Sequence, residues 1–183
     1  MRIKKSEGLK LYGQGRLTAT VKGTRRYGVR KIVDIEGQPY FAGRPILNSG
    51  IVVAEMEIDN LIVTLGKGLV GDMLIDKAGY DTGLTWQAIG TGVTAPALGD
   101  TQLTTETARK AITSRTRSGN VVTFSTFFTA AESTYNIKEA GVFGHSTASA
   151  AANSGVLASH WLVSFDNSGG LYDITLDLTW SLG

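Results

Sequence analysis

Residues 172–181 read Tyr-Asp-Ile-Thr-Leu-Asp-Leu-Thr-Trp-Ser, a strict alternation of apolar and polar side chains. Successive side chains of a β-strand point to opposite faces, so this alternation predicts a strand with one apolar and one polar face. The apolar face, which runs from Tyr172 to Trp180, must lie in a core. The polar face carries Asp173 and Asp177 and must meet water or a basic partner.

One helix is expected, over residues 61–76. Its apolar residues recur at intervals of three and four along one face, and Asn60 or Thr64 could cap its start. The three glycines in its interior each cost about 1 kcal/mol relative to alanine, so this helix persists only if it is packed against a sheet. A shorter helical turn is expected between Asp100 and Glu106.

Several other short apolar segments predict strands, with turn residues between them. The fold class that follows is mainly β, an antiparallel β-sandwich-like domain with one packed helix, plus a basic N-terminal arm. We expect the arm, a β-leaning segment, over residues 1–57 and the assembly domain over residues 58–183. Further strands are expected at residues 84–89, 110–117, 121–129, 137–143 and 155–165, with a hairpin turn at 118–120 and an exposed loop at 145–155.

The charge of the chain is unevenly distributed. The 183 residues carry a net charge of +2, but residues 1–31 hold ten basic side chains against one glutamate, so the remainder is net negative. Such a basic arm fits an acidic protein partner, and we expect no nucleic acid partner because few aromatic residues accompany the cations. The candidate contact residues of the arm are Arg2, Lys4, Lys5, Lys10, Arg16, Lys22, Arg25, Arg26, Arg30 and Lys31.

Sequence motifs for catalysis, metals and cofactors are lacking. Cysteine is absent, the two histidines do not form a zinc motif, and no Gly-x-Ser-x-Gly turn presents a nucleophile. We interpret His160 as a strand residue with one satisfied polar edge. No apolar run is long enough to span a membrane. We therefore expect no enzyme activity, no cofactor, no small-molecule ligand and no membrane partner.

Three charged residues next to expected strands stand out, namely Glu106, Arg109 and Glu139. A bidentate Arg109–carboxylate pair that joins the turn to the strand at residues 137–143 would fix their register. We predict a structural role for these three side chains rather than a catalytic one.

A series of short motifs occurs in a fixed order between residues 58 and 183. They are Ile89-Gly90-Thr91-Gly92, Ala95-Pro96-Ala97, Asp100-Thr101-Gln102-Leu103 with Glu106 and Arg109, Ile137-Lys138-Glu139-Ala140-Gly141-Val142-Phe143, and Gly155-Val156-Leu157-Ala158. This series resembles a group of small tailed-bacteriophage virion proteins and, more distantly, the N-terminal attachment domain of phage tail-collar fibre proteins. That family often has arginine where this chain has Lys138.

The resemblance implies a non-enzymatic virion structural protein, assembled in the host cytoplasm and located in the tail tip, baseplate or fibre-attachment region. Its partners would be other virion structural proteins and copies of itself. An alternative is a capsid decoration protein on the phage head. A further alternative is a carbohydrate-binding β-sandwich with Trp86 or Trp161 as the sugar platform.

Overall fold

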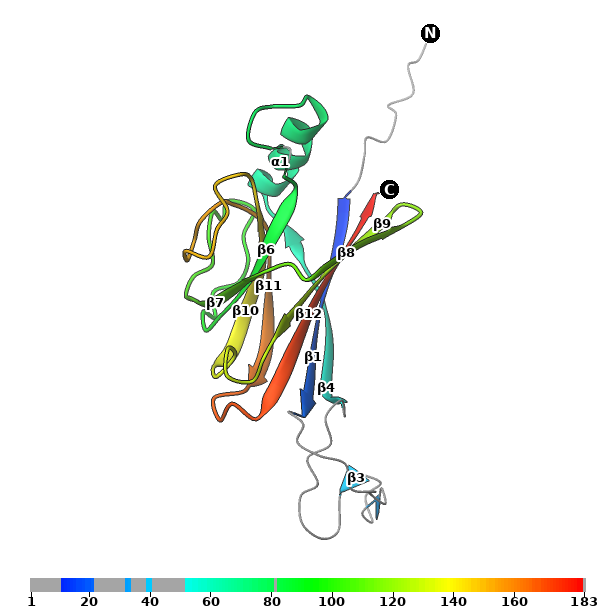
Figure 1. The fold of residues 1–183 in the computed structure, drawn as a ribbon, viewed down its shortest axis with the longest axis vertical. Coiled ribbons are helices and arrows are strands. Elements are labelled where there is room, and N and C mark those ends of the chain that lie inside the picture. Colours follow the sequence, from blue (N-terminus) through cyan, green and yellow to red (C-terminus); the bar gives the residue numbers. More distant parts are fainter. Residues whose placement is uncertain (1–10, 22–31, 34–38, 41–51, 81, 183) are drawn as a thin grey trace.

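Two antiparallel five-stranded sheets pack face to face (Figure 1). The computed structural model describes residues 11–21, 32–33, 39–40, 52–80 and 82–182. The first sheet has the strand order β4-β1-β12-β9-β8, and the second has β5-β11-β10-β6-β7. These sheets and one helix confirm the predicted fold class. The elements are β1 Leu11–Val21, β2 Ile32–Val33, β3 Pro39–Tyr40, β4 Val52–Asp59, β5 Leu61–Ile62, α1 Thr64–Leu74, β6 Leu84–Gly90, β7 Glu106–Ala111, β8 Ser114–Ser118, β9 Val121–Phe128, β10 Asn136–Gly144, β11 Val156–Asp166 and β12 Tyr172–Leu182.

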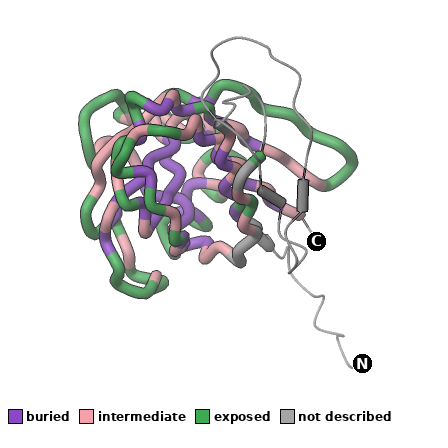
Figure 2. The backbone as a smooth tube through the Cα atoms, turned by 90° about the horizontal axis from the view of Figure 1, so that it is seen from below, coloured by how far each residue is buried: buried purple, intermediate pink, exposed green. Residues whose placement is uncertain are grey.

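The alternating segment 172–181 forms β12, the central strand of the first sheet. Ile174, Leu176 and Leu178 are fully buried, and Trp180 is almost so. Figure 2 shows the buried segments gathered in the interior between the sheets, with exposed segments around them. Trp180 Nε1 also donates a hydrogen bond to Ser159 Oγ of the second sheet at 3.1 Å. Both the strand and the face that enters the core are as predicted.

β1 is an integral strand of the first sheet, paired with β12 on one side and β4 on the other. Leu17 and Ala19 are fully buried, and a side chain at Gly15 would collide with the Trp161 indole. The expected boundary between residues 57 and 58 falls inside β4. The expected division into arm and domain therefore does not hold for β1 and β4, because both are strands of the first sheet. Most of the expected arm lies outside the described residues.

The helix α1 is shorter than expected because its first residues belong to a strand. Leu61 and Ile62 form β5, which pairs with β11. The residue that precedes the helix is Val63, and no side chain caps it. Instead, the amide of Thr64 donates to the carbonyl of Leu98 at 2.9 Å. The helix packs against a sheet, as expected, and approaches it closely at Gly66, where an added Cβ would overlap the backbone of Ala158 in β11.

The chain changes sheets between β7 and β8, where one long strand was expected. The amide of Ile112 donates to Thr85 in the second sheet, and the amide of Thr113 donates to Ser125 in the first. β8 then turns into β9 at Gly119, whose φ of +58° suits glycine, so the predicted hairpin is present. The helical turn expected from Asp100 to Glu106 is not present, because backbone amides there bond to a buried carboxylate instead.

Candidate interaction surface and its buried frame

The carboxylate of Glu139, on the central strand β10, organises the loop 91–105. This side chain is fully buried. Its oxygens accept backbone hydrogen bonds from Gly92 at 3.1 Å, Thr104 at 3.0 Å and Thr105 at 2.6 Å. A buried charge is tolerable only when its hydrogen bonds are satisfied, and three amides provide that compensation here. The loop is thereby fastened to the sheet at both of its ends.

His160 of β11 completes this network from the neighbouring strand. Its Nε2 lies 3.1 Å from Glu139 Oε2, and its Nδ1 lies 2.7 Å from Asp100 Oδ2. The same Oδ2 of Asp100 also accepts a hydrogen bond from the amide of Ala97 at 2.8 Å. Both ring nitrogens face carboxylates, so the imidazolium form can donate to both. The network thus holds the middle of the loop as well as its ends.

The two buried titratable groups shift each other's ionisation. Burial opposes the charged form of Glu139, but hydrogen bonds from His160, Thr105 and Thr104 outweigh it and lower the pKa of the carboxyl. Burial likewise opposes the charge on His160, but the bonds to Glu139 and Asp100 raise its pKa above 6.5. Both shifts favour the charged forms, so the contact between the two side chains is charge-assisted and fastens the loop.

Arg109 and Glu106, both on β7, form a second buried pair. The guanidinium donates from Nε and Nη2 to the two carboxylate oxygens of Glu106 at 2.7 and 2.8 Å, and both side chains are almost fully enclosed. Nη1 also donates to the carbonyl of Ser154 at 2.7 Å, and the guanidinium lies 4.1 Å from the centre of the Phe143 ring. This one side chain therefore connects the loop 145–155 to the second sheet.

The structure separates the three charged residues that were expected to cooperate. Arg109 pairs with Glu106, but the expected pair with Glu139 does not form, because the carboxylate oxygens of Glu139 bind His160 and backbone amides. The sequence indicated the importance of these residues but missed His160 as the partner. Its position on β11, directly opposite Gly141 of β10, could not be read from its spacing in the chain.

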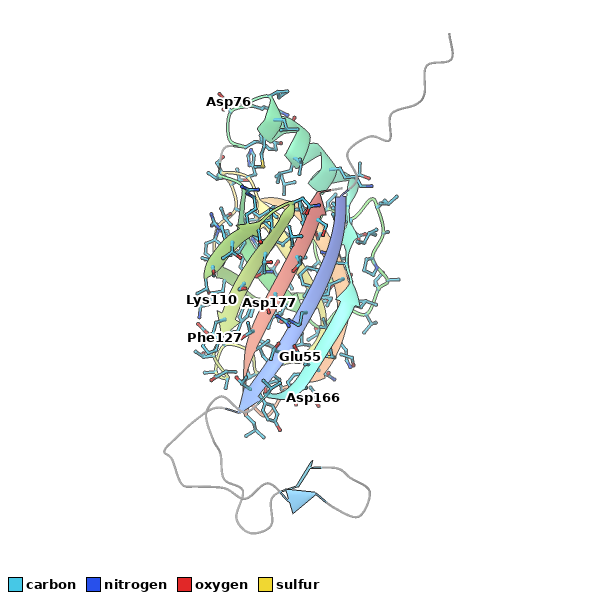
Figure 3. All side chains as sticks on the ribbon, turned by 90° about the vertical axis from the view of Figure 1, so that its right-hand side faces the viewer. Glu55, Asp76, Lys110, Phe127, Asp166 and Asp177 are labelled. Carbon is cyan, nitrogen blue, oxygen red and sulfur yellow. The ribbon has the colours of Figure 1, made fainter. Side chains whose placement is uncertain are left out.

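One member of the expected contact arm, Arg16, lies in the described part of the chain. It projects from β1 and forms ion pairs with Glu55 at 3.0 Å and Asp177 at 3.1 Å. Figure 3 shows Glu55 and Asp177 on the same outward face of the first sheet. Asp177 thus has a basic partner within this chain. The remaining arm residues, Arg2, Lys4, Lys5, Lys10, Lys22, Arg25, Arg26, Arg30 and Lys31, lie outside the described residues.

An apolar groove opens beside α1, at one end of the sandwich. Its volume is about 410 Å³. Figure 1 shows α1 and the tip of the β8–β9 hairpin on either side of this end of the molecule. The floor is aromatic and aliphatic, while two arginines of the edge strand β8 line its rim. The lining residues used below are Leu69, Val70 and Met73 of α1, Val122 and Phe124 of β9, Trp180 of β12, and Arg115 and Arg117 of β8.

The end of α1 next to this groove is itself apolar and exposed. Leu74 and Ile75 keep 76% and 73% of their surface in solvent, and Met73 keeps 42%. Large apolar side chains that stand together on a surface mark interaction sites in soluble proteins. Because the internal polar groups serve to fasten loops, we take the groove and this helix end together as the candidate interaction surface, and use that name below.

The described residues offer little for the alternative kinds of site. They contain no group of three or more side chains placed to hold a metal ion. No helix among them is long and apolar enough to cross a membrane. Trp161, one of the two expected sugar platforms, is fully buried and cannot stack on a ligand, and Trp86 packs against the cluster that contains Phe143. No family model, curated protein or solved structure matches this chain.

Proposed function

We propose that this chain is a non-enzymatic structural protein of a tailed-phage virion that works through contacts between subunits. The observation that carries the proposal is the candidate interaction surface, where exposed Leu74 and Ile75 stand beside an apolar groove. A scaffold with buried ion pairs and an exposed apolar end is suited to assembly. The resemblance to small phage virion proteins supports the tail tip, baseplate or fibre-attachment region as its place.

The test begins with purified particles of the phage that encodes the chain. Particles are dissociated, heads and tails are separated by density, and each fraction is probed for the chain and its copy number. Association with tails at a low, ring-like copy number supports the proposal. Association with heads in hundreds of copies would support the decoration alternative, and absence from both fractions overturns a virion role.

A pair of variants connects this test to the candidate interaction surface. Leu74→Ser with Ile75→Ser removes exposed apolar area without opening the core, so the fold should persist while incorporation into particles falls. Val93→Ser is the matched control, because Val93 is exposed to 73% on the loop 91–105 and does not line the groove. If the double variant and Val93→Ser are incorporated equally well, the candidate interaction surface has no role in assembly.

A further inference from the structure

We infer that the partner seated in the groove is a second copy of this chain, which inserts the end of its own α1. The inference rests on the proposed function and names the partner of the candidate interaction surface. The helix end and the groove are both apolar, and they carry opposite charges. Each molecule has both the helix end and the groove, so two copies can bind each other.

The apolar match joins the exposed apolar side chains at the end of α1 to the apolar groove. Leu74 and Ile75 are exposed at the end of α1. The groove is lined by Phe124 and Trp180, both of which are less than one-tenth exposed. A volume of about 410 Å³ lies within the range of about 300–1,000 Å³ typical of ligand pockets, so it can admit protruding side chains. Burial of these groups would remove apolar surface from water on both copies.

The charge match joins one acid at the helix end to arginines on the rim. Asp76 follows the apolar end of α1, and Figure 3 shows it at the end of α1 that points away from the sheets. Asp72 already pairs with Lys77 at 3.0 Å and is not part of this match. Arg115 and Arg117 project from the exposed edge strand β8. Neither arginine forms an ion pair with a described residue, and Asp76 likewise forms none within that part of the chain. A second copy would supply the missing opposite charges.

The proximity of groove and helix end in one molecule favours a closed pair. Each copy can donate its helix end and receive the other's, which is the self-complementary contact of a twofold dimer. The loop that follows α1 is already held, because Ser146 donates its amide to the carbonyl of Gly79 at 2.8 Å and the Tyr80 ring packs edge-on against His145. A helix end fixed in this way loses little conformational freedom on docking.

The inference is tested by sedimentation equilibrium of the purified full chain over a range of concentrations. We expect a reversible dimer, weakened by salt because opposite charges meet across it. Arg115→Glu and Asp76→Lys should each raise the dimer dissociation constant by at least about tenfold, because like charges would then face each other. An equimolar mixture of the two variants should restore association, since both contacts in each mixed dimer then join opposite charges.

The control is Lys138→Glu, which makes the same charge change on β10, where the lysine contacts Ser164. It should leave the dimer unchanged, and circular dichroism checks that every variant keeps the fold. A chain that stays monomeric at all concentrations overturns the inference, as does a dimer that neither charge variant weakens. Virion incorporation without a dimer would overturn the inference and leave the proposed function. A dimer of this kind without virion incorporation would support the inference and overturn the proposed function.

Discussion

The Nε2 atom of His160 lies 3.1 Å from Oε2 of Glu139, and both residues are buried. Strands β10 and β11 bring this pair together from positions twenty-one residues apart. The contact joins two strands to the loop 91–105 through the amides that Glu139 binds. Two buried titratable side chains therefore help to hold this loop on the sheet.

We predict that the stabilisation from this pair peaks in a defined pH window. His160 has a raised pKa, so its contribution is complete below about 6.5 and is lost as the pH rises through the folded value. Glu139 has a lowered pKa, so its contribution is complete above about 4.5 and is lost as the pH falls through the folded value. The difference in unfolding free energy between the natural chain and His160→Gln should be largest between these pH values. A difference that does not vary with pH would contradict this assignment.

The variant Glu139→Gln should release the loop 91–105. The neutral amide cannot compensate a charged His160, and breaking a buried pair in this way costs about 3–5 kcal/mol of unfolding free energy. Hydrogen exchange should show loss of protection at the amides of Thr104 and Thr105. The control Glu55→Gln alters a half-exposed pair with Arg16 and should cost less than about 1 kcal/mol. Unchanged protection at both amides would show that other contacts hold the loop.

The variant Arg109→Ala should free the loop 145–155 and leave Glu106 as an unpaired buried carboxylate. We expect a loss of about 3–5 kcal/mol in unfolding free energy and faster cleavage of this loop by a nonspecific protease. Lys110→Ala removes a neighbouring cation whose pair with Glu132 is half-exposed, and should cost about 0–1 kcal/mol. Similar losses of unfolding free energy for Arg109→Ala and Lys110→Ala would show that Arg109 does not hold the loop 145–155.

Two glycines of α1 should respond oppositely to alanine. At Gly66 the added Cβ would overlap the carbonyl group of Ala158, so the helix must move off β11 at a cost of about 1–3 kcal/mol. At Gly68 no atom lies within 4 Å of the added Cβ, so the better helix propensity of alanine should stabilise the chain by up to about 1 kcal/mol. Urea denaturation of both variants measures the sign. Destabilisation by Gly68→Ala would mean that this face of α1 is covered.

The parts of the fold that the sequence predicted are those whose periodicity reflects burial. β12 alternates strictly because it has one buried face, and α1 shows its helical period because one side packs on β11. The period of β1 was weak, because the small residues Gly15 and Ala19 occupy buried positions, and the Trp161 indole fills the space beside Gly15. The surrounding basic residues suggested a separate arm, although Arg16 itself pairs within the sandwich.

The candidate site was less predictable because its contacts join distant segments. The pairing of Glu106 with Arg109, three residues apart, was within reach of sequence reasoning, since both were already singled out. The link between His160 and Glu139 depends on the register of two strands and has no sequence period. The exposure of Leu74 and Ile75 also escaped prediction, because apolar residues near the end of a helix are usually assigned to a core.

The pairing of β1 with β12 has a consequence for how the chain folds during synthesis. Leu11 lies opposite Leu182, so the two ends of the described chain meet in adjacent strands of one sheet. β1 is synthesised well before β12, its partner on this side. Contacts between such distant segments slow folding, because a long loop must close before they form. Until β12 emerges, Leu17 and its neighbours lack the strand that completes their layer, so β1 is exposed throughout the synthesis of the segments between them.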